Sequence, residues 1–237
     1  MKKITILIVL ASQMATAQVS HNRVFLGVNE SSIGYDYSMI GANVQTFSKF
    51  SNGKIGLNVG YIYEQKIVKS LFVSAGLEFK TLNNAITRPH FYNDPILRTG
   101  VINEDLHFSR LQVPLLLKYK FPSKTKNQFY LYAGSGIILV NRVKREASYS
   151  ISFPAGDSVT NIELKQKAMF GKNSSLGSTI IFGTGYDFKI KKNSFSIELG
   201  FAGDISKTRI TTFENIENNS YYFTKFKSIE FKVAYCF

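Results

Sequence analysis

The chain has 237 residues, of which 44% are apolar and 19% are charged, and its formal net charge is +13. The length suits one all-β domain or one barrel, and no linker divides the sequence. The basic excess favours an anionic partner such as phosphorylated glycolipid, and the alternative is a basic surface that only keeps the protein soluble. Nucleic acid is not the expected one, because the aromatic residues follow strand periodicity and form no basic and aromatic groove. The single cysteine, Cys236, excludes an internal disulfide framework.

The N-terminus has the three regions of a secretory signal peptide. A basic start at residues 1–3 precedes an apolar run at residues 4–10, and the small residues Ala15-Thr16-Ala17 form the cleavage site. We therefore expect residues 1–17 to be removed. The mature domain, residues 18–237, then begins at Gln18 with 27 basic and 16 acidic residues, a net charge of +11. Beyond the signal, no apolar run approaches the ~18 residues that a membrane-spanning helix needs, so a membrane role requires strands.

Eight later segments alternate apolar with polar or small residues, which is the period of β-strands. About eight strands, an even number, suit a closed antiparallel barrel. Pro114 cannot donate a hydrogen bond to a neighbouring strand and predicts a bulge. In chain order, the apolar faces of the segments fall at residues 24–28, 55–63, 71–79, 111–121, 129–139, 180–188, 195–201 and 229–237.

The lengths of the connections test the barrel hypothesis independently. Bacterial outer-membrane barrels join their strands by short periplasmic turns and longer extracellular loops. The predicted short turns, at residues 64–70, 122–128 and 189–194, all carry lysine. This arrangement places both termini in the periplasm. The predicted long connections are residues 31–54, 81–107, 140–177 and 206–227.

The apolar face could meet lipid, or it could fill the interior of a soluble lipocalin-like barrel. Aromatic residues favour lipid, because they collect on the apolar face at the periplasmic edge and so form a girdle, which a soluble barrel does not need. They are Tyr61, Tyr63, Tyr119, Phe121, Phe129, Tyr186, Phe188, Phe195, Tyr235 and Phe237.

Three features together resemble the PorT-like outer-membrane β-barrel family of Bacteroidetes. They are the sequence LQVPLLLKYK at residues 111–120, the glycine-bearing segment Tyr132-Ala133-Gly134 and the terminal Phe237. The resemblance covers most of the mature chain, except the long connections. It implies an all-β fold and an outer-membrane location, and it carries no catalytic residues. Some members of the family serve the type IX secretion and gliding machinery, which makes a secretion assembly one role that the resemblance suggests.

The polar face predicts a filled lumen. Eight strands enclose a space only wide enough for side chains, and buried charges are tolerable when they are paired and hydrogen-bonded. An ion path needs a wider bore and one dominant sign, so a structural plug is favoured over a channel. The charged residues of this face are Glu64, Glu78, Asp187, Glu198, Asp204 and Glu230 beside Lys80, Arg110, Lys118, Lys120 and Lys232.

Two glycine-x-glycine pairs, at residues 134–136 and 183–185, do not form a dinucleotide fingerprint, because the third glycine and the following helix are both missing. On an inward face, glycine more simply makes room for large neighbours such as Tyr130 and Tyr132.

Metal-ligating residue types share the predicted connection at residues 81–107, but their spacing fits no known site, so an ordinary polar loop is favoured. These residues are His90, Asp94, Glu104, Asp105 and His107.

His107 and Ser109 lie two residues apart and so point the same way, as a base and a nucleophile do in lipid-modifying barrel hydrolases. Glu146 is the candidate for the orienting carboxylate. No local motif supports this site, and we assign no catalytic, cofactor-binding or metal-binding residue.

The leading functional hypothesis is a non-enzymatic outer-membrane barrel that scaffolds surface loops or docks a partner. A lipid hydrolase or acyltransferase and a narrow channel are the alternatives. We expect contact with outer-membrane lipid and lipopolysaccharide and with a protein partner, and we expect Val233, Tyr235 and Phe237 to act as a terminal insertion signal. The longest predicted loop, residues 140–177, is the expected binding element, and the alternative is that it only extends the hairpin and screens the surface. It contains Arg142, Lys144, Arg145, Lys165 and Lys167 with Tyr149, Phe153, Met169 and Phe170.

Overall fold

The fold was analysed in a computed structural model. It describes residues 20–38, 52–91, 99–125, 127–152, 161–162, 171–173, 177–206, 208–211 and 221–237. The expected signal peptide at residues 1–17 lies outside these residues. In the part of the chain that is described, no helix is long and apolar enough to cross a membrane.

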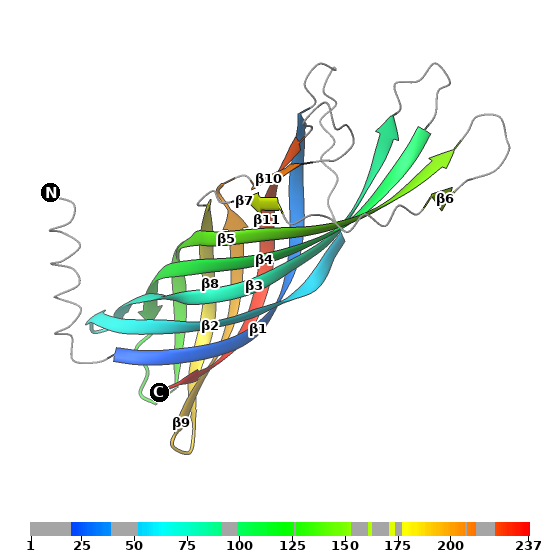
Figure 1. The fold of residues 1–237 in the computed structure, drawn as a ribbon. Helices are drawn as coiled ribbons and strands as arrows, with labels where there is room; N and C mark the ends of the chain where they lie inside the picture. Colours follow the sequence, from blue (N-terminus) through cyan, green and yellow to red (C-terminus); the bar gives the residue numbers. More distant parts are fainter. Residues whose placement is uncertain are drawn as a thin grey trace, which may run out of the picture.

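Within the described ranges, eight long antiparallel strands form a closed barrel in the order β1-β2-β3-β4-β5-β8-β9-β11 (Figure 1). The barrel closes where β1 pairs with β11, from Arg23 opposite Cys236 to Ser38 opposite Tyr221. Three short strands, β6 (Asn161–Ile162), β7 (Gly171–Asn173) and β10 (Thr208–Thr211), pair with β5 and β11. The long strands are β1 (Ser20–Ser38), β2 (Asn52–Val68), β3 (Leu71–Phe91), β4 (Thr99–Lys120), β5 (Gln128–Ser152), β8 (Gly177–Ile190), β9 (Asn193–Asp204) and β11 (Tyr221–Cys236).

The two faces of the lower barrel have opposite chemistry. Apolar side chains point outward, and Ile55 and Leu26 remain 72% and 65% exposed. Charged side chains point inward, and Glu64 and Lys80 are 0% and 1% exposed. A soluble barrel has the reverse arrangement. The prediction that the apolar face meets lipid is therefore confirmed.

The aromatic girdle is confirmed as a set of ring contacts around the lower rim. On one side, the ring of Phe121 lies 5.2 Å from Tyr119 and 5.6 Å from Phe129, between centroids. On the other side, contacts run from β8 through β9 to the C-terminus, which places the end of the chain within the girdle. These contacts join Tyr186 to Phe188, Phe188 to Phe195, Phe195 to Tyr235 and Tyr235 to Phe237.

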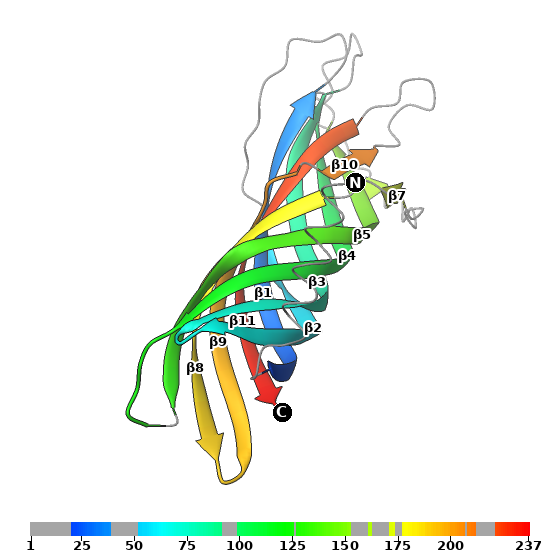
Figure 2. The same cartoon turned by 90° about the vertical axis from the view of Figure 1, so that its left-hand side faces the viewer.

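The short turns gather at the end of the barrel that holds the C-terminus (Figure 2). Lys69-Ser70 joins β2 to β3, and Lys191-Lys192 joins β8 to β9. The connection between β4 and β5 spans residues 121–127. The prediction of short turns here is confirmed, although the strands run further into the turns than their alternation indicates.

The predicted long connections join the strands at the opposite end of the barrel, but their predicted bounds are too wide, because much of that length is strand. Strand β3 continues to Phe91, β4 starts at Thr99 and β5 ends only at Ser152. The alternation reverses its phase in these extensions. On β4, Leu106 and Phe108 are apolar and buried inside, whereas the alternate residues from Leu111 on point outward and include Leu115 and Leu117. Above the apolar band the strands therefore have the pattern of a soluble barrel, and β3, β4 and β5 reach away together (Figure 1).

The predicted bulge at Pro114 is also wrong in position. Pro114 pairs with Gly136 on β5, and the pairing of β3 with β4 keeps one register on both sides of it. The shift lies at Leu111 and Gln112, where Leu139 is the extra residue of β5. A proline removes one donor from a ladder, and here the ladder continues past it without changing register.

Candidate functional site: a filled lumen and an outer wall

The lowest layer of the lumen is an ion cluster around Glu64. Lys118 Nζ and Lys120 Nζ each lie 2.7 Å from a Glu64 oxygen. Arg23 reaches Glu64, Asp187 and Glu198, each at 3.2 Å. Three cations thus face three carboxylates, which compensates for the loss of water around each charge.

The side chain of Tyr130 belongs to the same layer. Its hydroxyl donates a hydrogen bond to Glu198 Oε1 at 2.6 Å, and Lys118 Nζ lies 4.2 Å from the centre of its ring. Glycines opposite make room for the tyrosines, as predicted: a Cβ added at Gly183 or Gly185 would overlap Tyr132 or Tyr130, respectively.

The middle layer is a second balanced cluster. Lys232 Nζ lies 2.8 Å from both Glu78 and Glu230, and Lys80 Nζ lies 2.6 Å from Glu230. Gln112 donates to Glu78 at 2.6 Å. Side chains from three strands, β3, β4 and β11, are joined here, so the layer crosslinks the wall from within.

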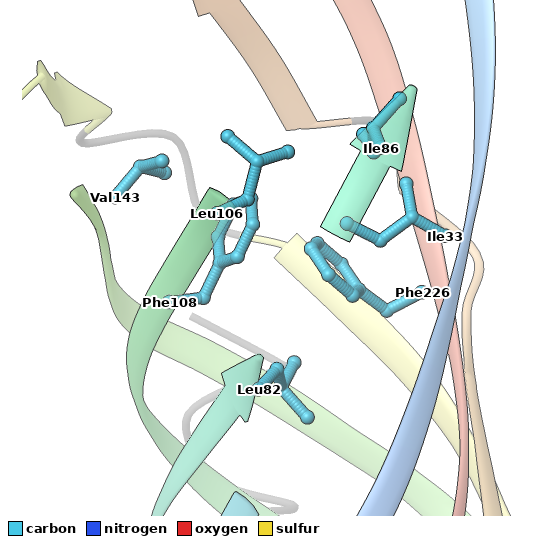
Figure 3. Close-up of a cluster of buried hydrophobic side chains, with 7 residues drawn as sticks. All are labelled: Ile33, Leu82, Ile86, Leu106, Phe108, Val143 and Phe226. Atoms are coloured by element: carbon cyan, nitrogen blue, oxygen red, sulfur yellow. The ribbon is translucent and has the colours of Figure 1, made fainter. Parts of the chain in front are cut away.

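The upper layer changes from charged to apolar. Arg110 and Asp204 form a two-point pair with distances of 2.7 and 2.9 Å, and the guanidinium lies over the ring of Phe226. The ring of Phe226 in turn packs edge-on against Phe108 at 4.3 Å. Figure 3 shows the apolar cluster that begins there and fills the interior above. Its members are Ile33, Leu82, Ile86, Leu106, Phe108, Val143 and Phe226.

The predicted pairing of lumen charges is confirmed, since each of the eleven charged residues predicted for this face takes part in an ion pair. Arg23 was missed. The weak alternation of β1 hid it, although Arg23 shares the inward phase with Gly27 and Asn29, and this phase could have revealed it. With Arg23, the three ionic layers hold six cations and six carboxylates. The basic members are Arg23, Lys80, Arg110, Lys118, Lys120 and Lys232, and the acidic members are Glu64, Glu78, Asp187, Glu198, Asp204 and Glu230.

His107, the candidate base, contacts the side chain of Asn83. Its Nδ1 lies 3.1 Å from Asn83 Oδ1, and the amide nitrogen of Asn83 donates to the Ile55 carbonyl at 2.9 Å. Since Asn83 Oδ1 is the acceptor, Nδ1 of His107 is the donor. Ile55 lies where β2 shifts its register against β3. Asn83 therefore stabilises the backbone at this irregularity, and a hydrogen bond from His107 fixes the side chain of Asn83. Within the described residues, no hydrogen bond joins His107 to Ser109.

The residues of metal-ligating type between positions 81 and 107 are distributed over different faces. Glu104 points into the barrel, whereas Asp105 pairs outside with Lys54 at 2.6 Å. His90 belongs to β3, and Asp94 lies outside the described residues. No group of three or more metal-ligating residues occurs in the described ranges.

The upper strands form an outer wall, defined here as the extensions of β1, β3, β4, β5 and β11 that surround the apolar cluster. Its outward face is polar and includes Ser109, Arg142, Lys144, Lys225 and Lys227. Arg145 and Tyr149 belong to β5, but their side chains lie outside the described set. Lys165, Lys167, Phe153, Met169 and Phe170, expected to act in binding, also lie outside the described residues.

Several solved structures match this chain over most of its length. OprG from Pseudomonas aeruginosa is 11% identical, with a TM-score of 0.47, covering 93% of this chain and 97% of that one. Ail, the attachment invasion locus protein of Yersinia pestis, is 12% identical, with a TM-score of 0.34, covering 92% and 99%. Neisserial surface protein A is 12% identical, with a TM-score of 0.35, covering 90% and 96%. No curated protein matched the sequence.

The family comparison covers most of the chain. The family model of the outer membrane protein beta-barrel domain matches residues 16–208. This range contains the strands from β1 to β9 and the residues of the lower ion cluster. Together with the apolar outer face and the aromatic girdle, the match places the protein in the bacterial outer membrane, and the chain belongs to the outer membrane protein β-barrel domain family.

Proposed function

We propose that the protein is a non-enzymatic docking component whose outer wall binds a partner at the cell surface. The length of the strands carries the proposal. A strand needs about 9 to 11 residues to cross the membrane, whereas β3, β4 and β5 have 21, 22 and 25 residues. Roughly half of each strand therefore forms the wall, which its own apolar cluster holds rigid. Binding residues commonly lie on segments that a rigid scaffold positions.

The lumen is a structural plug in this proposal and not a conduit. Its ion pairs cross the interior between strands that are not neighbours, and an apolar layer lies above them. A permeating ion would have to separate these pairs and then cross apolar side chains, both of which are costly. The hydrolase hypothesis gains no support from His107, because its Nδ1 contacts Asn83. The PorT-like resemblance at residues 111–120 supports a secretion assembly as the setting of the docking.

Site-specific photocrosslinking in intact cells tests the proposal. A photoreactive residue replaces His107, Lys144 or Lys227 on the wall, and Leu115, which faces lipid, serves as the control. The expected result is one recurring protein adduct from wall positions and none from Leu115. A docking wall would be refuted if the wall positions yielded no protein adduct in intact cells. It would also be refuted if adducts came only from a photoreactive residue at Lys124, on the periplasmic side.

A further inference from the structure

The periplasmic turns form a rim of lysines, called here the lysine rim. The carboxylates nearest to it, Glu64 and Asp187, turn into the lumen and pair with Lys120 and Arg23. Among the described residues of these turns, no acidic side chain is exposed. The rim therefore carries an uncompensated positive charge. Its members are Lys66, Lys69, Lys124, Lys189, Lys191 and Lys192.

The height of the rim matches the headgroup layer of the membrane. Phe188 and Phe195 pair in the aromatic girdle, and only two further rungs separate them from the turn at Lys191-Lys192. Because a strand rises about 3.3 Å per residue and is tilted, the turn lies roughly 5 Å beyond the girdle. One headgroup layer is about 5–7 Å thick. Lys191 and Lys192 thus lie within reach of the lipid phosphates of this layer.

Apolar side chains among the lysines support the same placement. Ile67, Val68 and Ile190 are 55%, 57% and 54% exposed at the tips of two turns. Exposed isoleucine and valine beside lysine are unfavourable in open water but suit the interface, where an apolar side chain meets acyl chains and an ammonium meets phosphate.

The backbone of one turn is a further observation. Lys191 has a φ of 56°, and it is the one non-glycine residue with positive φ in the described ranges. A two-residue hairpin turn with this conformation at its first position is most easily formed by glycine. The chain places a lysine there despite the backbone cost, and such costs concentrate at functional positions.

We propose that the lysine rim binds the phosphates of anionic phospholipids in the periplasmic leaflet. The distribution of the lysines favours lipid over a protein. The hairpins β2–β3 and β8–β9 lie on opposite sides of the barrel in the strand order, with β4–β5 between them along one half of the perimeter. Lipid surrounds a barrel on every side, whereas a protein partner docks on one face. The rim acts independently of the outer wall.

Native mass spectrometry of the full barrel, extracted from membranes, tests the proposal with phosphatidylglycerol and phosphatidylcholine as probes. The wild-type protein should retain phosphatidylglycerol in preference to phosphatidylcholine. Lys191→Gln with Lys192→Gln should weaken phosphatidylglycerol binding about fivefold for each lysine, which corresponds to about 1 kcal/mol per lysine near an anionic surface. The matched control, Lys225→Gln with Lys227→Gln, removes two lysines from the outer wall and should leave the preference unchanged.

Two more variants separate lipid binding from folding. Lys191→Gly with Lys192→Gln removes the same charge and relieves the turn, so it should lose phosphatidylglycerol while unfolding at no lower temperature than wild type. Lys191→Arg with Lys192→Arg keeps the charge and should keep the lipid. Equal retention of both lipids by wild type, an equal loss in the outer-wall control, or full retention by the glycine variant overturns the proposal. The proposal is also overturned if the glutamine variant keeps its lipid but no longer crosslinks to a periplasmic protein in cells, because the rim would then bind a protein.

Discussion

Arg23 offers the sharpest test of the filled lumen, because its single guanidinium contacts three carboxylates. In Arg23→Leu, Lys118 and Lys120 remain to balance Glu64, Asp187 and Glu198, so one negative charge in the lowest layer loses its counterion. Breaking a buried ion pair from one side costs about 3–5 kcal/mol, since the remaining charge stays buried without its partner. We expect a loss of that size in the free energy of unfolding.

Urea unfolding of the protein in lipid vesicles, followed by the heat-dependent shift in gel mobility, measures this loss. Arg142→Leu removes an exposed arginine from the outer wall and is the control, with an expected change within about 0.5 kcal/mol. Arg23→Leu combined with Glu198→Gln restores the balance of charge in the layer. The double variant should therefore be more stable than the sum of the two single losses predicts.

A small effect would refute the reasoning. If Arg23→Leu cost less than about 1 kcal/mol, the lowest layer would behave like an exposed ion pair screened by water. Additive losses in the double variant would show that Arg23 and Glu198 do not interact as their 3.2 Å separation indicates. Either result would reopen the channel hypothesis.

The other predictions concern the wall, the glycines and the C-terminus. Phe108→Ala should cost about 3–5 kcal/mol through the cavity left in the apolar cluster. The wall should become sensitive to protease while the inserted barrel keeps its mobility shift, and an unchanged digestion pattern would contradict this. Gly183→Ala should destabilise the barrel by overlap with Tyr132, and Tyr132→Ala should remove part of that effect in an unfolding cycle, whereas strict additivity would argue against the contact. Deleting Phe237 with Tyr235→Ala should reduce the amount of protein in the outer membrane, and undiminished insertion would exclude a terminal signal.

The membrane-spanning half of the barrel could be predicted from the sequence because one face must be apolar along every strand. The alternation of residues 229–237 or 111–121 leaves few other structures open. The same rule placed the inward charges correctly, since an eight-stranded lumen admits charged side chains only when they pair.

The outer wall could not be predicted from the alternation, because the prediction assumed that apolar residues stay on the same face along the whole strand. On β11, Phe226 points inward and Ile229 outward, so the apolar residues change sides within three positions. The same change occurs on β4 between Phe108 and Leu111. Above the membrane the wall meets water, and its apolar side must turn inward. A reversal of phase within a long segment is thus a sequence signal for a barrel that continues past the membrane.

The partner of each charged residue could not be predicted from the sequence either, because it depends on the register between the strands. Arg110 and Asp204 are 94 residues apart and meet only through the order of the strands. The role of His107 depends on the irregular pairing of β2 near Ile55, which places Asn83 beside the imidazole. Residue types and spacing alone made His107 and Ser109 look like a base and a nucleophile.

Because the charges inside the lumen balance, the net charge of the protein must lie on its outer surfaces. The three ionic layers hold equal numbers of cations and carboxylates, so they contribute no net charge to the formal +13 of the chain. The basic excess must lie outside these layers, and within the described residues it concentrates at both ends: Lys225 and Lys227 on the outer wall, and Lys191 and Lys192 on the periplasmic rim. The lysines of the periplasmic rim lie at the height of the headgroup layer, where each lysine near an anionic surface contributes about 1 kcal/mol, whereas those of the outer wall face water. The lumen therefore serves stability, and the charges available for recognition lie at the two ends of the barrel.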